Sequence, residues 1–350
     1  MSSDATRVSI IVVAYNAAKY IDACVTSLER AGGYHEIIVV DQASSDGTPD
    51  LVERHVPAVQ LIRAGANLGF AAGNNLGARA ASGDVLALFN PDAFATAGWL
   101  QPLVAALAGS VGIASPKVYR GLPGEATIID SAGCDLEFPI GEGPPRGYLE
   151  PDDGRFDEPA LVAYASGAAM VIRRDLYEML GGLDESFFCY CEESDLCWRA
   201  RMRGIASAYV PASTVYHVGS ANLGSRSAQK LYFQTRNRIR MCLQNYAWLN
   251  ALIFAGNEIV HGACVIAISL FFANYRPLGL AYLRAWMDVV RSSGLTWRTR
   301  TRRQRERTVG DGDVLRLHRR VGIFATLARY RRMTRQRAAS LFNSTVPLSP

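Results

Sequence analysis

The sequence predicts an α/β fold with a mostly parallel central sheet, followed by a C-terminal helical region. Over the first 120 residues, uninterrupted apolar runs of strand length alternate with segments whose apolar residues recur at helical spacing. Uninterrupted runs are typical of strands buried on both faces, and their alternation with helices predicts parallel strands joined by right-handed crossovers. From residue 229 onward only helical patterns remain, which predicts a helical region after the sheet.

Length and composition indicate a folded protein of about two domains. The chain has 350 residues, of which 49% are hydrophobic and 20% are charged, so it can bury a large core and is not a disordered chain. Its seven cysteines show no repeating spacing, which favours reduced thiols in a cytoplasmic compartment. The apolar run near the N-terminus lacks a small-residue cleavage site, so we interpret it as a strand.

The periodicity predicts the elements in turn. Apolar runs predict strands, and helical spacing bounded by cap and turn residues predicts helices. The expected strands are 8–15, 36–41, 59–64, 84–90, 111–119, 207–210 and 214–216, with a further regular segment at 162–173. The expected helices are 21–28, 49–56, 70–81, 99–107, 175–180 and 192–203. Residues 125–159 are rich in Gly, Pro and acids and predict a long excursion with one or two hairpin strands.

Polar residues follow four of the predicted strands. The first strand runs into Asn16, the second ends at Asp41, the third precedes Asn67, and the fourth runs into Asn90 and Asp92. Ligands of open parallel sheets bind beyond the carboxyl ends of the strands, so we expect one polar crevice rather than four unrelated turns. The sequence contains no P-loop and no glycine-rich dinucleotide motif after the first strand, which argues against those two ligand classes.

Two positions carry side chains suited to a divalent cation. Asp92 stands at a strand end, where a carboxylate can hold Mg²⁺ or Mn²⁺ against phosphate oxygens, and such ions usually take only one or two protein carboxylates. His217 follows the last predicted strand and is a candidate further ligand, although a lone histidine at a strand end is more often structural.

Three carboxylates occupy four positions at the start of the helix expected over 192–203. Glu192, Glu193 and Asp195 could simply favour the helix N-terminus, where acids are stabilising. Crowded carboxylates in a partly dry setting also raise one another's pKa, which is how an acidic side chain becomes a general base near neutrality. Both interpretations remain open from the residues alone.

The C-terminal region combines an apolar segment with clustered arginines. Residues 298–337 contain 14 arginines and three acids, which leaves residues 1–297 with a net charge of −6. The apolar segment 248–275 is interrupted by polar residues, so a helix in the membrane interface or a re-entrant pair fits better than a clean span, with a buried helical hairpin as the alternative. An apolar segment next to clustered arginines predicts association with an anionic membrane surface. No nucleic acid partner is expected, because base-stacking aromatics are scarce in this segment.

The motifs at these positions, in combination and in order, resemble those of glycosyltransferase family 2, and more narrowly its bacterial rhamnosyltransferase-like branch. The resemblance implies the GT-A nucleotide-sugar-binding fold, with a catalytic domain at 1–246 and a helical, arginine-rich, membrane-associated region at 247–350. The segments that carry it are 8–16, 40–48, 67–75, 89–93, 166–170, 181–188, 192–199, 217–220 and 229–246.

The same resemblance implies roles for individual residues. Asp92 and His217 would hold the metal, and Glu193 would be the general base. Three positions depart from the family pattern: Asn90 replaces the first carboxylate of D-x-D, Gln42 replaces the usual Asn, and Glu193 is one methylene longer than Asp, so the base could shift to Asp195 or Glu192. The implied donor site consists of Ala14, Tyr15, Asn16, Asp41, Asn67, Gly73, Asn74, Asn75, Asn90 and Asp92.

The activity implied by the resemblance is inverting hexosyl transfer. The donor would be a nucleotide sugar, with L-rhamnose from dTDP-rhamnose as the best match, and the acceptor a cell-envelope or polysaccharide glycan, for example one linked to polyprenyl diphosphate. The cofactor would be Mg²⁺ or Mn²⁺, and the enzyme would be cytoplasmic and peripherally associated with the inner face of the plasma membrane. The alternatives are a nucleic-acid-binding protein that uses the arginine-rich segment and a non-catalytic membrane scaffold with the same fold.

Overall fold

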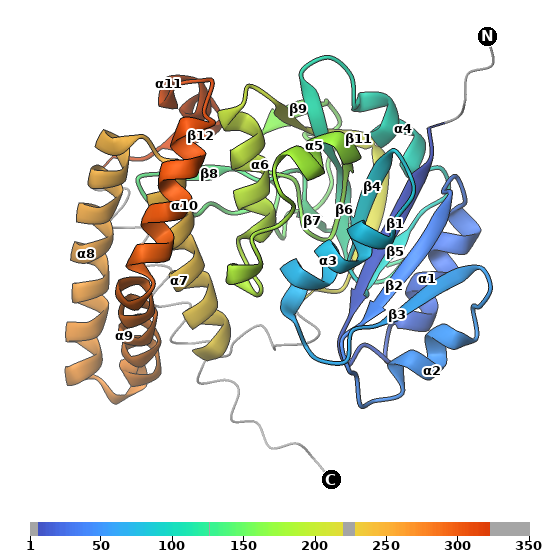
Figure 1. The fold of residues 1–350 in the computed structure, drawn as a ribbon, viewed down its shortest axis with the longest axis horizontal. Helices are drawn as coiled ribbons and strands as arrows, with labels where there is room; N and C mark the ends of the chain where they lie inside the picture. The colour runs from blue at the N-terminus through green and yellow to red at the C-terminus, as the bar shows by residue number, and fades with distance from the viewer. Residues whose placement is uncertain (1–5, 126, 220–227, 323–350) are drawn as a thin grey trace. The chain divides into compact units, whose positions relative to one another are not determined.

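The computed structural model describes residues 6–125, 127–219 and 228–322, and the chain divides into two compact units (Figure 1). Unit 1 comprises residues 1–135 and 144–222, and unit 2 comprises residues 136–143 and 223–350. The α/β character of the first part of the chain and the helical character of the second are confirmed. The division lies earlier than the boundary expected after residue 246, because helix α7 (Ala228–Asn245) packs with helices further along the chain.

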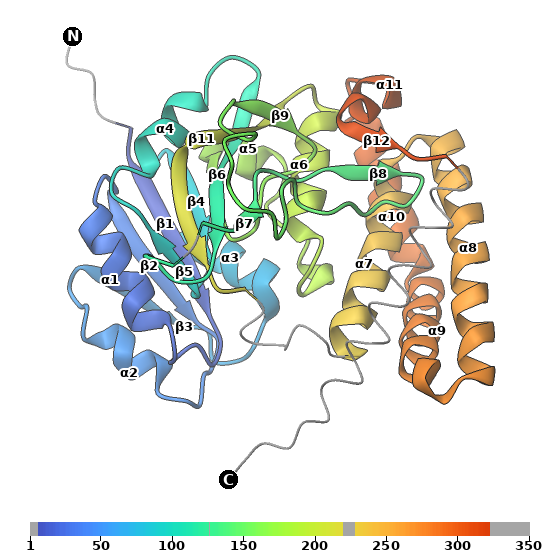
Figure 2. The ribbon, with the colours of Figure 1, turned by 180° about the vertical axis from the view of Figure 1, so that it is seen from behind.

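The sheet of unit 1 begins with four parallel strands, as the sequence predicts (Figure 2). Beyond β4 the sheet is mixed, because β10 pairs antiparallel with both β4 and β6, while β11 runs parallel to β6. A strand that is reached without a helical crossover can pair in the antiparallel direction. The strand order is β3 (Val59–Arg63), β2 (Glu36–Asp41), β1 (Val8–Ala14), β4 (Val85–Phe89), β10 (Ala169–Arg173), β6 (Val111–Arg120), β11 (Ala206–His217) and β5 (Ala93–Ala95).

Two hydrophobic cores cover the two faces of this sheet. Alternate residues of β1 enter different cores, with Ile10 and Val12 in the first and Ile11 and Val13 in the second. This follows from the two-residue period of a strand. Helices α1 (Ile21–Ala31), α2 (Thr48–Glu53) and α4 (Leu100–Ala106) pack on the first core, and α3 (Gly69–Ala80), α5 (Arg174–Met179) and α6 (Glu192–Met202) pack on the second.

The excursion over 125–159 contains strands, as the sequence predicts, but they pair with the main sheet or with unit 2. Strand β7 (Ile129–Ser131) pairs with β6, and β9 (Ala160–Val162), just after the excursion, pairs with β11. The two short strands expected at 207–210 and 214–216 form the single strand β11, whose register shifts between Val210 and Thr214. A β-bulge of this kind interrupts the pattern without ending the strand.

Unit 2 consists mainly of helices. Among its described residues, β8 and β12 pair in parallel, and β12 falls in a stretch for which the sequence predicts only helix. The elements are β8 (Leu136–Phe138), α7, α8 (Trp248–Phe271), a 3₁₀ turn (Ala273–Tyr275), α9 (Arg276–Arg291), α10 (Ser293–Arg305), α11 (Asp311–Val314), a second 3₁₀ turn (Leu315–Leu317) and β12 (His318–Arg320).

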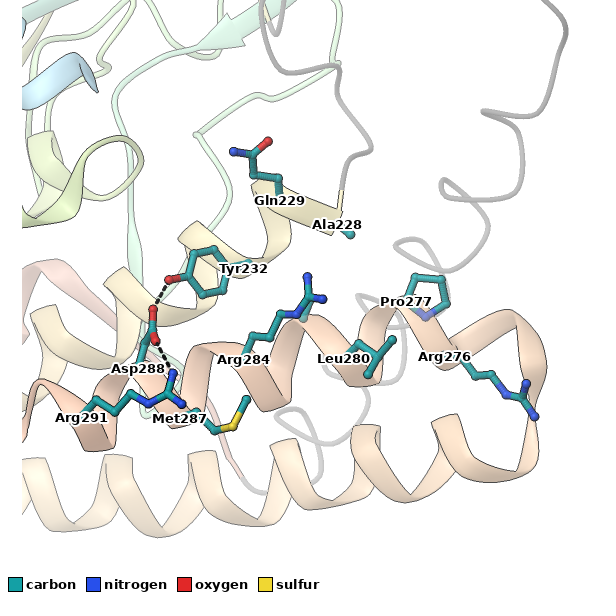
Figure 3. A pocket seen from close by; sticks show the side chains of 11 residues that line it. Ala228, Gln229, Tyr232, Arg276, Pro277, Leu280, Arg284, Met287, Asp288 and Arg291 are labelled. Atoms are coloured by element: carbon teal, nitrogen blue, oxygen red, sulfur yellow. Dashed lines mark hydrogen bonds and ion pairs between the residues drawn. The ribbon is translucent and has the colours of Figure 1, made fainter. Parts of the chain in front are cut away.

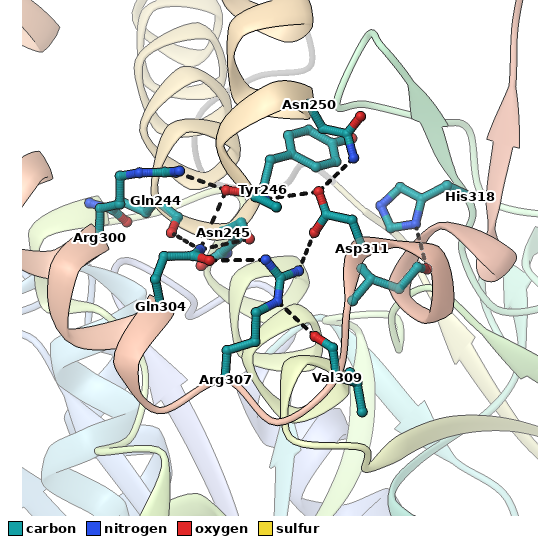
Figure 4. A network of polar contacts seen from close by, with 12 residues as sticks. Gln244, Asn245, Tyr246, Asn250, Arg300, Gln304, Arg307, Val309, Asp311 and His318 are labelled. Atoms are coloured by element: carbon teal, nitrogen blue, oxygen red, sulfur yellow. Dashed lines mark hydrogen bonds and ion pairs between the residues drawn. The ribbon is translucent and has the colours of Figure 1, made fainter.

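Several arginines of the basic stretch are structural. Arg300 donates to the carbonyl oxygen of Tyr246 at 2.8 Å (Figure 4). Arg303 donates to the side-chain oxygens of Gln244 at 2.9 Å and Asn245 at 3.0 Å. Cations and donors at a helix C-terminus satisfy carbonyl groups that have no partner inside the helix. These buried arginines therefore hold the end of α7 and are not available to an external polyanion.

Helix α8 has its polar face buried and its apolar face exposed. Glu258 pairs with Arg238 at 2.7 Å, and His261 contacts the hydroxyl of Tyr282 at 3.0 Å. Among the described residues, α8 is the helix whose length and composition would allow it to cross a membrane, and a third of its apolar window is buried. Its exposed large side chains are Trp248, Leu249, Leu252, Ile253, Ile259, Val260, Ile268, Leu270 and Phe271.

Candidate active site

The loops that follow β1 and β2 are joined at the carboxyl ends of these strands. Ala14 and Asp41 are paired in the parallel ladder. Beyond them, the backbone N–H of Asn16 donates to Ser44 Oγ at 2.9 Å, and Asn16 Oδ1 accepts from the backbone N–H of Ser45 at 2.9 Å. Asn16 has a φ of 48°, a left-handed conformation that Asn tolerates better than most residues. The structure therefore brings residues 14–16 and Asp41 to the same edge.

Asp41 and Tyr15 differ in their access to solvent. Asp41 is buried, and its Oδ2 accepts from the backbone N–H of Ser44 at 3.4 Å. Within the described ranges its Oδ1 has no hydrogen-bond partner, although buried polar atoms are rarely left unsatisfied. Tyr15, in contrast, is 37% exposed. A buried carboxylate oxygen with free bonding capacity beside an exposed aromatic ring suits the recognition of a polar heterocycle.

The residues of helix α3 mainly serve packing. A Cβ on Gly73 would lie 2.6 Å from Val13, so glycine is needed for the close approach of α3 to β1. Asn75 donates to Leu183 O and Glu185 Oε1 and accepts from the Leu183 N–H and the Tyr177 hydroxyl. These four bonds use the full capacity of its amide. They favour a structural role for Asn75 over the predicted role in donor binding.

Asn67 and Asn74 retain some bonding capacity. Asn67 is exposed, and its Oδ1 accepts from the backbone N–H of Gly69 at 3.0 Å. Asn74 is buried and donates to the carbonyl of Phe70 at 2.9 Å, while its Oδ1 has no partner in the described part of the chain. Their predicted roles in donor binding are compatible with this geometry.

Asp92 and His217 meet at the other side of β4. His217 Nε2 lies 3.3 Å from Asp92 Oδ1, and the side-chain amide of Asn90 lies 3.3 Å from the same nitrogen. On the other side of the ring, His217 Nδ1 lies 2.9 Å from Asp130 Oδ2. His217, the last residue of β11, therefore contacts both Asp92 in the turn after β4 and Asp130.

The charges of this group are coupled. Burial opposes ionisation of both Asp92 and His217, but the hydrogen bonds and the attraction between them outweigh that cost. The pKa of Asp92 is therefore lowered, and the bonds to Asp130 and Asp92 raise the pKa of His217 to about 9. In the absence of a metal, the histidine is a cation held between two carboxylates.

The three carboxylates of α6 have different surroundings. Asp195 is fully buried and accepts from Arg199 Nε at 2.7 Å, and the same guanidinium donates to the carbonyls of Leu180 and Gly182. This ion pair favours a structural role for Asp195. Glu193 points toward Gly167, where an added Cβ would lie 3.2 Å from Glu193 Oε1.

Glu192 and Glu193 each keep one buried carboxylate oxygen without a hydrogen-bond partner among the described residues. Burial raises the pKa of both groups, and the charge of Glu193 raises the pKa of Glu192 further. A carboxylate held in this way accepts a proton more readily than one in water. Both remain candidates for the general base.

The loop that faces Glu193 is hydrogen-bonded to the turn that carries Asp92. The backbone N–H of Asn90 donates to the carbonyl of Ala168 at 3.0 Å, and Ala168 follows Gly167, which faces the Glu193 carboxylate. The turn after β4 is thus bonded directly to the loop on which Glu193 packs. A carboxylate with a raised pKa and a carboxylate–imidazole pair therefore lie on, or pack against, two segments that are hydrogen-bonded to each other.

A match to the family model for glycosyl transferase family 2 covers residues 9–181. This segment contains the first four strands and the turn that carries Asp92. The chain belongs to glycosyltransferase family 2. This glycosyltransferase is 28% identical over 249 residues to the N-acetylglucosaminyl-diphospho-decaprenol L-rhamnosyltransferase of Mycobacterium tuberculosis, covering 63% of this chain and 79% of the relative. It is also 28% identical to the low-salt glycan biosynthesis hexosyltransferase Agl10 of Haloferax volcanii, covering 66% and 73% of the two chains.

Solved structures show the same GT-A fold. The structure of GalNAc-T7 with UDP, GalNAc and Mn²⁺ has a TM-score of 0.54 at 18% identity and covers 69% of this glycosyltransferase and 48% of that chain. The mannosyltransferase PcManGT from Pyrobaculum calidifontis, in complex with GDP-Man and Mn²⁺, has a TM-score of 0.51 at 18% identity. The match covers 98% of this glycosyltransferase and 87% of that chain. The expectations of family, fold class and enzymatic character are therefore confirmed.

Sequence reasoning missed two residues of this candidate site. Asp130 lies in the aperiodic excursion, where no pattern distinguishes it from the neighbouring acids. Gly167 stands inside a motif that the resemblance quotes, but only the structure shows that its missing side chain makes room for Glu193.

Proposed function

We propose that this enzyme is an inverting glycosyltransferase that moves a sugar from a nucleotide-sugar donor to a glycan on a polyprenyl-diphosphate-linked acceptor. L-Rhamnose from dTDP-rhamnose is the proposed donor sugar. The support is the similarity to the M. tuberculosis L-rhamnosyltransferase, whose name specifies a decaprenol-linked acceptor. The observation on which the proposal mainly depends is the link between Glu193 and Asp92 through Gly167, Ala168 and Asn90.

The residues at Asp92 and His217 fit a divalent cation. One carboxylate and one imidazole face each other at 3.3 Å, and Asp130 bonds the second ring nitrogen at 2.9 Å, as an outer carboxylate commonly does for a metal-binding histidine. Among the described residues there is no group of three or more His, Cys, Asp or Glu that could hold a metal. The remaining ligands would therefore be diphosphate oxygens and water, which is usual for Mg²⁺ and acceptable for Mn²⁺.

The reaction proposed is a single in-line displacement at the anomeric carbon. Glu193 takes the proton of the acceptor hydroxyl as its oxygen bonds the sugar, and the bond from the sugar to the nucleoside diphosphate breaks. A bound divalent cation would supply positive charge to the departing diphosphate. Asp41, Tyr15 and Asn16 would hold the nucleoside at the edge formed by β1 and β2. Because no covalent glycosyl-enzyme forms, one displacement inverts the anomeric configuration.

Membrane association is proposed from the surface of α8. Its polar residues are bonded inside unit 2, while side chains such as Leu249 and Phe271 are 70% and 83% exposed. Such a face is costly in water and suits a helix that lies in the membrane interface. Together with the exposed arginines of α9 and α10, it supports a cytoplasmic enzyme on the inner face of the plasma membrane.

The decisive experiment measures donor binding with and without metal. A panel of nucleotide sugars is screened by thermal shift with Mg²⁺ or Mn²⁺, comparing the wild type with Asp92→Ala and with Asp50→Ala, which removes an exposed carboxylate of α2. A ligand that binds only the folded state raises the melting temperature. We expect metal-dependent shifts in the wild type and Asp50→Ala and none in Asp92→Ala. Equal shifts in all three proteins, or shifts that persist in chelator, would contradict the proposal.

A further inference from the structure

Unit 2 contains a groove between the start of α7 and helix α9 (Figure 3). Its volume is about 710 Å³, within the range of about 300–1,000 Å³ common for small-molecule sites. Leu280, Met287 and three arginines of α9 line one side, and Tyr232 lies on the α7 side. None of the residues proposed for sugar transfer belongs to this groove.

The groove is positively charged. Asp288 is the acid among its lining residues, and it accepts from the Tyr232 hydroxyl and lies 3.7 Å from Arg291. Arg276 and Arg284 are exposed and have no ion-pair partner within the described ranges of the chain. Each guanidinium is therefore available to an anion, and a single guanidinium can donate two parallel hydrogen bonds to the oxygens of one phosphate.

The rest of the lining is apolar and open to solvent. Leu280 is 55% exposed and Met287 is 39% exposed. On the same helix, Leu283 and Val290 are 42% and 71% exposed, so the apolar surface continues beyond the groove. A soluble anion would leave this surface in water, whereas a ligand with a hydrocarbon chain would cover it.

We propose that this groove binds one anionic phospholipid, with its phosphate at Arg284 and an acyl chain along Leu280 and Met287. The free positive charge selects the phosphate, and the exposed apolar lining selects the chain. Nucleic acid fits poorly, because the aromatic ring of the groove is already engaged: the Tyr232 hydroxyl binds Asp288, and Arg236 lies 5.4 Å from its ring centre. The inference extends the proposed membrane association, but it concerns a single lipid and not the membrane surface.

The test uses full-length protein and lipids that are monomeric in water. Binding of dihexanoyl phosphatidylglycerol is measured by thermal shift and titration calorimetry, beside dihexanoyl phosphatidylcholine, farnesyl phosphate and inorganic phosphate. We expect phosphatidylglycerol to bind most tightly. Arg284→Glu should weaken it by about tenfold or more, the effect of losing one charge-assisted contact. Arg298→Glu makes the same charge change at an exposed position of α10 outside the groove and should leave binding within about twofold.

Each other outcome would overturn the proposal. Tighter binding of farnesyl phosphate would identify a site for a prenyl-linked substrate, and equal protection by inorganic phosphate would identify a simple anion site. Equal losses in both glutamate variants would show nonspecific attraction. Arg284→Ala and Leu280→Gln, which alter exposed side chains, serve as second variants if Arg284→Glu does not fold. Nucleotide-sugar binding is measured on the same samples, so failure of the proposed sugar transfer would be seen separately.

Discussion

At the scale of single residues, Glu193 is the strongest candidate for the base because its carboxylate faces Gly167 and its pKa is raised by burial. We expect Glu193→Gln to keep donor binding and to lose about 10²–10⁴-fold in kcat, the usual contribution of a general base. Glu192→Gln is the matched control, because it makes the same change at the adjacent buried carboxylate. A larger loss in Glu192→Gln than in Glu193→Gln would transfer the role to Glu192.

The pH profile of the wild type provides a second check on the same residue. The base works only when it is deprotonated, so activity falls as the pH drops through its pKa. Because burial raises the pKa of Glu193 above its ordinary value of 4.5, the acidic limb of kcat should lie above pH 4.5. A rate that stays constant down to that pH would contradict the assignment.

Asp130 is expected to position His217 and not to touch the substrate. Its Oδ2 lies 2.9 Å from His217 Nδ1, which directs Nε2 toward Asp92. Asp130→Asn should lower Mn²⁺ affinity about 10–100-fold, as is typical when the outer partner of a metal-binding histidine is lost. The measurement is metal titration followed by electron paramagnetic resonance. Asp153→Asn, in the same excursion but paired with Arg155, should leave the affinity unchanged.

Residue type and strand-end position predicted part of this site and missed part of it. Asp92 and His217 stood out because each follows a strand, and the structure brings them together at 3.3 Å. Asn75 and Asp195 are polar residues that were also predicted for the site, yet both are occupied by internal hydrogen bonds. Whether an amide or carboxylate is free depends on partners distant in sequence, such as Leu183 for Asn75, and spacing alone does not reveal them.

At the scale of elements, helix α6 is fixed by a buried ion pair. Arg199 binds Asp195 and the carbonyls of Leu180 and Gly182, which ties the helix to the loop after α5. Arg199→Met should leave Asp195 as an unpaired buried charge and lower the free energy of unfolding by about 3–5 kcal/mol. Denaturant unfolding measures this, and the double variant Asp195→Asn with Arg199→Met should recover part of the loss. No recovery would mean that the contacts to the carbonyls matter more than the charge.

Elements with a strong local pattern were predictable, and those defined by distant pairing were not. Strands β1, β2 and β4 are largely continuous apolar runs, β3 is apolar apart from Gln60 and Arg63, and the structure forms all four close to the expected bounds. β8 and β12 are three residues long and exist because 136–138 and 318–320 pair across about half of the chain. β10 was expected as a regular segment, but its antiparallel direction depends on the route of the chain around it. Short strands of this kind have no local period to detect.

At the scale of the whole molecule, the sequence predicts a membrane partner from an arginine-rich stretch and an apolar segment. The structure shows which residues of each are bonded internally and which face outward. The arginine-rich stretch is partly internal, since Arg300 and Arg303 hold the end of α7. The polar interruptions of the apolar segment, such as Glu258 and His261, are likewise bonded inside unit 2. The outward face of α8 is therefore more apolar than the segment as a whole. This finding supports a helix that lies in the interface, one of the forms considered from the sequence.

The exposed face of α8 can be tested directly with vesicles. Ile253 and Val260 are 44% and 58% exposed, so replacing both with Glu should not disturb the packing of unit 2 but should place two charges in an apolar contact. We expect the fraction that sediments with phosphatidylglycerol vesicles to fall about tenfold or more, because charges are costly in the hydrocarbon region. Leu161→Glu, a change at an apolar side chain of unit 1 that is 49% exposed, should sediment like the wild type. If the α8 variant still sediments fully at high salt, where attraction between charges is screened, another surface must hold the protein to the membrane.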